Sequence, residues 1–235
     1  MLIQLDGNVS LNSQDSDTID NENLFPKIDK ISTALSLPII ATYNLRSLLP
    51  KVNCLKTDIL EREIDVAFLQ GIWENSENIK YQSEIEKMFE LNGLLYKSTP
   101  RMKGKGKVNY GGAALIINSL KYSFSEVNVS VPSGLEIIWG LLRPKTQSSK
   151  YNSIIVCSFY SPPNKYKYPK MADHICSTLH MLYTTYPDSG IILGADINSM
   201  NISSILNCGL KLRQIVDKNT RGRKVIDVII TNLST

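Results

Sequence analysis

Short apolar runs of strand length alternate with helical patterns from residue 37 to residue 231, and this alternation constrains the fold most. The strand-length runs cover residues 37–43, 65–70, 113–118, 136–142, 153–160, 190–194 and 225–231. Helical patterns lie between them at residues 52–59, 77–91 and 171–186. A series of this kind predicts an α/β or mixed α+β fold, because each apolar sheet face needs a helix or a second sheet to cover it.

The length of 235 residues, with 43% hydrophobic and 20% charged side chains, predicts one globular domain rather than two. Its body is expected to begin at Leu37. Residues 1–36 are rich in Asn, Asp and Ser and have no sustained apolar period, so we expect a mobile arm. Six acidic residues against two lysines make this arm acidic. The remaining 24 basic and 16 acidic residues give residues 37–235 a net charge of +8, which suits a polyanionic partner.

Composition also excludes several classes of protein. No apolar run approaches the roughly 20 residues of a membrane-spanning helix, and the N-terminus lacks a signal-peptide pattern, so we expect an intracellular protein with no membrane partner. His174 and His180 lie six residues apart, which places them on different helix faces rather than in a metal-ligand pair. The cysteines form no C-x-x-C pair, which indicates four buried free thiols rather than a zinc or disulfide framework. They are Cys54, Cys157, Cys176 and Cys208.

Polar residues stand at the ends of four predicted strands: Asn44, Tyr160, Asp196 with Asn198, and Asp227. Because Asp196 and Asn198 are two residues apart after a strand, their side chains are expected to point the same way. A carboxylate can bind Mg²⁺ or orient an attacking water, and a neutral amide can hold a phosphate oxygen. The pair therefore suits phosphoryl chemistry. The alternative is an Asx turn after a strand, which uses the same residue types.

Basic residues gather in three segments, two of which are interleaved with glycines or tyrosines. Such segments can follow a nucleic-acid backbone, where phosphate contacts supply most of the sequence-independent affinity. The alternative is a set of solvated surface loops. The candidates are Arg101, Lys103, Lys105 and Lys107, then Lys165, Lys167 and Lys170, and finally Arg221, Arg223 and Lys224.

The order of these strand-end motifs resembles the endonuclease/exonuclease/phosphatase superfamily. The motifs are Tyr43-Asn44-Leu45-Arg46-Ser47, Leu69-Gln70, Phe159-Tyr160-Ser161-Pro162-Pro163-Asn164, Gly194-x-Asp196-x-Asn198 and Val225-Ile226-Asp227. Residues 44–48 and 220–227 are most similar to the endonuclease domain of non-LTR (LINE-type) retrotransposons, and the likeness runs from about Pro38 to the C-terminus. It implies a four-layer sandwich of two mixed β-sheets flanked by helices. It also implies a nuclear, monomeric DNA endonuclease that uses Mg²⁺ (or Mn²⁺), needs no small-molecule cofactor and nicks one strand to prime reverse transcription.

The resemblance also implies a role for each strand-end residue. Asn44 would be a metal-side or phosphate-side amide, and Tyr160 a donor to the phosphate or the transition state. Asp196 would orient or deprotonate the attacking water and contact the metal, with Asn198 as its partner. Asp227 would orient a catalytic histidine.

Two departures from the superfamily pattern predict impaired catalysis. Gly71 occupies the position of a metal-binding glutamate, and neither Gln70 nor Glu74 is expected to replace it. The sequence ends at Thr235 without the histidine segment that follows the Asp227 strand in the superfamily, so we expect a C-terminally truncated domain that lacks its final strand. Three hypotheses remain open: an active nicking endonuclease, a catalytically dead DNA-binding remnant, and a phosphatase of the same superfamily.

Overall fold

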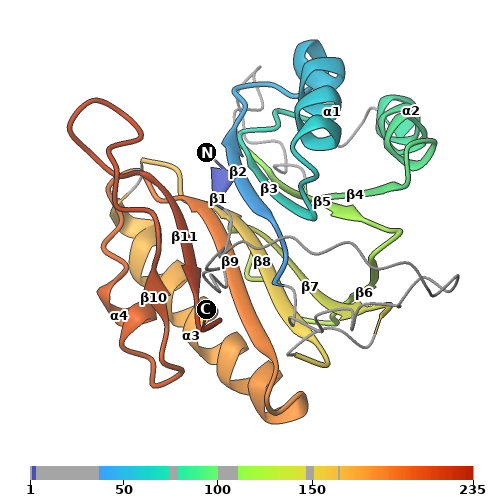
Figure 1. Cartoon of the computed structure of the whole chain (residues 1–235). Helices are drawn as coiled ribbons and strands as arrows, with labels where there is room; N and C mark the ends of the chain where they lie inside the picture. Colours follow the sequence, from blue (N-terminus) through green and yellow to red (C-terminus); the bar gives the residue numbers. More distant parts are fainter. Residues whose placement is uncertain are drawn as a thin grey trace, which may run out of the picture.

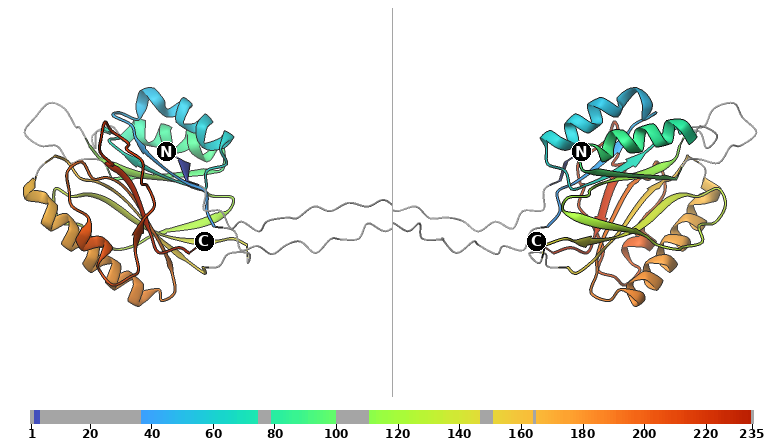
Figure 2. Two further views of the ribbon diagram at one scale, coloured as in Figure 1. Left: turned by 60° about the vertical axis from the view of Figure 1, so that its left-hand side comes forward. Right: turned by 90° about the vertical axis from the view of Figure 1, so that its right-hand side faces the viewer.

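Two β-sheets lie face to face in the computed structural model, and helices cover the outer face of each (Figures 1 and 2). The structure describes residues 2–3, 37–74, 79–99, 111–146, 151–163 and 165–234. Each sheet combines parallel and antiparallel strand pairs. The predicted four-layer sandwich of two mixed sheets flanked by helices is therefore confirmed.

The first sheet holds its strands in the order β1-β2-β3-β5-β4. These are β1 (Leu2–Ile3), β2 (Ile40–Asn44), β3 (Val66–Gln70), β5 (Ala113–Asn118) and β4 (Leu94–Thr99). Only the β2–β3 pair is parallel among them, and helix α1 (Val52–Glu61) connects those two strands after a 3₁₀ turn, η1 (Leu49–Lys51). Helix α2 (Ile79–Glu90) lies beside α1 on the same outer face (Figure 1).

The second sheet has the order β10-β11-β9-β8-β7-β6. These are β10 (Arg213–Gln214), β11 (Asp227–Thr231), β9 (Gly190–Asp196), β8 (Ile154–Tyr160), β7 (Glu136–Pro144) and β6 (Tyr122–Glu126). Its parallel pair, β8–β9, is connected by a 3₁₀ turn, η2 (Lys165–Lys167), and by helix α3 (Tyr168–Thr185). Helix α3 and the short helix α4 (Ser203–Leu206) cover the outer face (Figure 2).

Apolar side chains form three separate cores, one between each pair of layers. In the first sheet, strand β3 is buried along its whole length because helices cover one face and the second sheet covers the other. Val52, Leu55 and Ile59 form the predicted helical stripe and are all buried. In the core between the sheets, Phe68 of β3 lies directly over Gly194 of β9, where a β-carbon would overlap the phenyl ring. The two sheets therefore pack tightly at Gly194, two residues before Asp196.

Every strand and helix predicted from the sequence is present, with ends shifted by a few residues. Strands β1, β4, β6 and β10 and the short helix α4 were not predicted. Strand β6 has only one buried residue, Tyr122, because it lies at a sheet edge with one face open, so its composition is polar. Of the expected mobile arm, Leu2–Ile3 pair with β2 as a strand, and residues 4–36 lie outside the described residues.

All four cysteines are free thiols, as predicted, but they are not all buried. Cys54 is exposed, because it lies on the solvent side of α1, and Cys176 and Cys208 are half-buried. The prediction of four buried thiols was therefore wrong for three of them. Within the described residues, no helix is both long and apolar enough to cross a membrane.

Candidate functional site

Four polar side chains form one cross-strand row at the end of the second sheet. Asp227, Asp196, Tyr160 and Glu136 are direct register partners on β11, β9, β8 and β7. Partners in one row share a face of the sheet, and this face is turned toward the first sheet, as the contact of neighbouring Gly194 with Phe68 shows. The structure thus brings together three of the five predicted catalytic residues.

Asn44 meets this row from the first sheet. It ends β2, and its side-chain amide Nδ2 donates a hydrogen bond to Oδ2 of Asp196 at 2.5 Å. Asp196 is only 1% exposed, and its other oxygen, Oδ1, accepts the backbone N–H of Asn198 at 3.0 Å. Both carboxylate oxygens of Asp196 are therefore held by amide donors, one from each sheet.

Asn198 lies in the turn after β9 and fixes the neighbouring loop. It has a left-handed backbone (φ 48°), which asparagine tolerates better than most residues, and its Nδ2 donates to the carbonyl of Ser161 at 2.9 Å. The N–H of Ser161 in turn donates to the carbonyl of Asp196. Asp196 therefore does form the Asx turn that was the alternative interpretation. Its carboxylate also contacts Asn44 of the first sheet, so the turn does not account for all of its interactions.

Burial raises the pKa of Asp196 from its usual 3.8 to about 6, and the neighbouring carboxylate of Asp227 adds to this rise. The hydrogen bond from Asn198, the charge of Arg221 and the amide of Asn44 act in the opposite direction. Oδ1 of Asp227 is buried and has no hydrogen-bond partner among the described residues. An acid with a pKa near 6 can accept a proton at neutral pH, which suits a general base.

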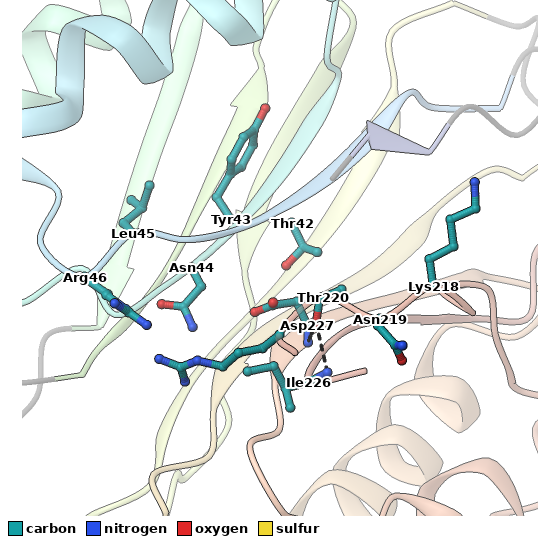
Figure 3. A pocket seen from close by; sticks show the side chains of 11 residues that line it. Thr42, Tyr43, Asn44, Leu45, Arg46, Lys218, Asn219, Thr220, Ile226 and Asp227 are labelled. Atoms are coloured by element: carbon teal, nitrogen blue, oxygen red, sulfur yellow. Dashed lines mark hydrogen bonds between the residues drawn. The ribbon is translucent and has the colours of Figure 1, made fainter. Parts of the chain in front are cut away.

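A cleft of about 610 Å³ opens between the ends of the two sheets at this position. Figure 3 shows Asn44 and Arg46 of the first sheet facing Thr220, Ile226 and Asp227 of the second. Three basic side chains and one acidic side chain line the cleft, which makes it attractive to anions. Its lining residues are Thr42, Tyr43, Asn44, Leu45, Arg46, Lys218, Asn219, Thr220, Arg221, Ile226 and Asp227.

A tight hairpin at residues 220–224 places Arg221 in this cleft. Thr220 and Arg221 both donate their N–H groups to the carbonyl of Lys224, and Gly222 supplies the left-handed backbone (φ 59°) that the turn requires. The hydroxyl of Thr220 accepts the N–H groups of Ile226 and Asp227, each at 3.0 Å (Figure 3). The hairpin is thereby tied to the start of β11, beside Asp227.

The metal centre that the resemblance implies does not fit the described residues. Gly71 has φ 65°, and a β-carbon there would lie 3.3 Å from Oδ1 of Asn44. Gln70 is fully buried and bonded between the sheets, and Glu74 accepts hydrogen bonds from Tyr96 and Ser98, so neither supplies the absent carboxylate. Within the described ranges, no three acidic, histidine or cysteine side chains lie close enough to share an ion.

The structure separates the predicted DNA-binding residues into three groups. All three basic residues of the 220–224 hairpin, Arg221, Arg223 and Lys224, are exposed, and Arg221 alone of them lines the cleft. Lys165 lies in η2, and nothing further is described of its side chain. The predicted basic loop with Arg101, Lys103, Lys105 and Lys107 lies outside the described residues.

Sequence reasoning missed several residues of the site. Glu136 is 2% exposed, and its Oε2 accepts the N–H of Gly112 at 2.6 Å, which ties the second sheet to the first. Its signal is an acid at the start of an otherwise apolar strand. Arg46 and Lys218 line the cleft, but isolated basic residues in loops carry no pattern that distinguishes them from other surface charges.

No protein-family model and no curated protein sequence matches this chain, but solved structures share its fold. The endonuclease domain of TRAS1, a telomere-specific non-LTR retrotransposon, has a TM-score of 0.54 at 15% identity, over 80% of this chain and 82% of that domain. An endonuclease/exonuclease/phosphatase protein of Bacteroides vulgatus has a TM-score of 0.59 at 11% identity, over 81% and 85%. The mannosyl-6-phosphatase Bt3783 of Bacteroides thetaiotaomicron has a TM-score of 0.56 at 16% identity, over 82% and 84%. This chain therefore has the fold of the endonuclease/exonuclease/phosphatase proteins.

Proposed function

We propose that this chain binds the phosphodiester backbone of DNA in the cleft between the sheets and hydrolyses it slowly. In this proposal the chain is an impaired endonuclease of the endonuclease/exonuclease/phosphatase superfamily. The observation that carries it is the contact of Asn44 with Asp196 beside a cleft lined by three basic side chains. A proton acceptor and an anion-binding surface are thereby placed side by side.

The hydrolytic step uses the groups that the two sheets bring together. A water molecule attacks phosphorus, Asp196 accepts one of its protons, and the new P–O bond forms as the bond to the leaving oxygen breaks. The leaving oxygen takes its proton from solvent. The amide of Asn44 keeps Asp196 aligned, and in this proposal Tyr160, the register partner of Asp196, donates to the phosphate oxygens.

The impairment follows from Gly71. A carboxylate at this position would be the main anionic ligand of Mg²⁺, the expected cofactor, and the described residues offer no substitute. The proposal therefore includes no protein-held metal ion. Loss of one acid–base or electrostatic group at such a site costs about 10²–10⁴-fold in rate.

A phosphatase is the second candidate, because three basic side chains line one compact cleft. A compact cationic cleft also suits a phosphomonoester on a small molecule. The fold neighbours include both a retrotransposon endonuclease and a mannosyl-6-phosphatase. The basic character of residues 37–235 favours DNA, since a long polyanion benefits from charge outside the cleft.

The test is a supercoiled-plasmid nicking assay at pH 7.5 that compares the wild-type chain with Asp196→Asn. The matched control is Asp188→Asn, the same chemical change at an exposed turn at the opposite end of β9. We expect slow nicking by wild type and Asp188→Asn, and none by Asp196→Asn. p-Nitrophenyl phosphate and sugar phosphates are assayed in parallel. Hydrolysis of these monoesters without plasmid nicking would replace the nuclease proposal with the phosphatase.

A further inference from the structure

We propose that Arg46 and Arg221 form a guanidinium clamp that holds the phosphate in this cleft without a protein-bound metal ion. The clamp rests on the proposed function, because it names how the same cleft takes its ligand. Arg46 follows β2 of the first sheet, Arg221 precedes β11 of the second, and both line the cleft. Charge is thereby supplied by side chains where the superfamily pattern would place a metal ion.

The backbone fixes Arg46 firmly in position. Arg46 and Ser47 have left-handed backbones (φ 49° and 94°), a conformation that non-glycine residues adopt only when surrounding contacts enforce it. Those contacts extend the β2–β3 pairing beyond the sheet: the N–H of Ser47 donates to the carbonyl of Gly71, and that of Leu48 to the carbonyl of Ile72. Strain held in this way at a cleft wall is typical of a ligand-binding position.

The backbone of Arg221 is also held in position by hydrogen bonds. The 220–224 hairpin and the hydroxyl of Thr220 hold its backbone against the start of β11. The guanidinium lies near enough to Asp196 to lower the pKa of that carboxyl. A phosphate bound by Arg221 would therefore lie next to the proton acceptor.

In the part of the chain that the structure describes, neither guanidinium forms a hydrogen bond or an ion pair, and the interaction of Arg221 with Asp196 is one of charge alone. Lys218 adds a third positive charge to the cleft. A guanidinium presents a planar fork of N–H donors that matches two phosphate oxygens at once. In the proposed clamp, the two forks in this one cleft contact the non-bridging oxygens of one phosphodiester group.

Gly71 explains why Arg46 is available. A β-carbon at position 71 would lie 3.4 Å from the backbone nitrogen of Arg46 and 3.8 Å from its α-carbon. An acidic side chain at this position would therefore start next to the backbone of Arg46, and the clamp predicts that it would compete with phosphate for the guanidinium. The glycine removes a metal ligand and frees an arginine at the same time.

The clamp predicts that DNA binding survives removal of divalent ions. Binding of a fluorescein-labelled duplex to the full chain is measured by fluorescence anisotropy in EDTA and in Mg²⁺, at several salt concentrations. We expect the same affinity in both within about twofold. Arg46→Ala and Arg221→Ala should each weaken binding about tenfold and lower the slope of log affinity against log salt by about one.

Lysine substitutions distinguish the effect of bidentate guanidinium contacts from the effect of positive charge alone. Arg46→Lys and Arg221→Lys keep the positive charge, so the salt slope should stay unchanged while affinity falls several-fold through loss of bidentate contacts. Gly71→Glu should weaken binding in EDTA by adding an acid beside Arg46. The matched control is Arg143→Ala, which removes an exposed arginine near the opposite end of the second sheet and should leave affinity unchanged.

The outcomes distinguish the clamp from the proposed function. If EDTA abolishes binding by wild type and Mg²⁺ restores it, the clamp is refuted while DNA remains the ligand. If both alanine variants bind as tightly as Arg143→Ala, the clamp is likewise refuted. Binding of neither DNA nor a phosphomonoester under any condition would overturn the proposed function itself.

Discussion

Asn44 and Asp196 are 152 residues apart in the chain, and the amide of one donates to the carboxylate of the other across the gap between the two sheets. The contact exists because β2 and β9 both end at the same edge of the sandwich, where Gly194 lets the sheets approach closely. Asp196 is buried there as an acid with a raised pKa. Alignment of this acid therefore depends on the packing of the whole sandwich.

Asp196→Asn should stabilise the fold at neutral pH. The folded-state pKa of about 6 lies above the ordinary 3.8, so the charged carboxylate costs stability once pH exceeds both values. Two pKa units correspond to roughly 2–3 kcal/mol, and an asparagine avoids this cost if the amide of Asn44 turns to present its oxygen. Urea unfolding at pH 7.5 should show this gain, and the difference should shrink as pH falls to 4. A less stable variant at pH 7.5 would contradict the prediction.

Hydrolysis should depend on pH through the same carboxyl group. The carboxylate form of Asp196 accepts the proton of water, and the protonated form cannot, so log rate should rise with pH up to about 6 and then level off. Initial rates of plasmid nicking between pH 4.5 and 8 measure this profile. DNA binding measured over the same range serves as the control for substrate affinity. A flat rate profile would exclude Asp196 as the base.

The sequence predicted the strands that are buried on both faces. A short apolar run such as Val66–Gln70, with turn residues on either side, indicates a buried strand. It did not predict Leu94–Thr99 or Tyr122–Glu126, which lie at sheet edges and carry several polar residues. Edge strands obtain their conformation from pairing with a neighbour. That pairing is a tertiary contact, and local composition does not encode it.

The site was predictable where chemistry coincides with a strand end. Asp196, Asn44 and Asp227 each end or begin a strand, so their convergence followed from the layered fold. Arg46 and Glu136 were not identified, because their roles depend on contacts between the sheets and on a left-handed loop. The sequence also gave no sign that Gly71 leaves Arg46 without an acidic neighbour, since that relationship requires the folded geometry.

Gln70→Leu should destabilise the sandwich by about 2–4 kcal/mol. Gln70 is fully buried, accepts a hydrogen bond from Thr42, and donates to Ser158 at 3.1 Å and to the carbonyl of Gly194 at 3.2 Å. Leucine fills a similar volume but removes all three of these hydrogen bonds between buried groups. The matched control, Gln82→Leu on α2, loses a single 3.5 Å bond to Ser98 and should cost far less in urea unfolding. Equal losses would show that the network contributes little.

Because of His174, the free energy of unfolding should decrease as the pH falls below neutral. It lies on α3 against the second sheet, 9% exposed, and the indole N–H of Trp139 donates to its Nε2 at 3.4 Å. Burial lowers the pKa of His174 below 6.5. As pH falls through 6.5, the unfolded chain binds a proton that the folded chain resists, so stability declines with falling pH. Protonation also converts Nε2 from an acceptor into a donor that opposes the indole N–H.

Replacing His174 by glutamine separates this effect from general acid destabilisation, because glutamine can accept the indole N–H and does not titrate. Between pH 7.5 and 5.5, the free energy of unfolding of His174→Gln should therefore fall less than that of wild type. His180→Gln changes a histidine on the exposed face of the same helix and is the matched control. If wild type and His174→Gln lose stability in parallel over this range, the acid sensitivity of the fold lies elsewhere.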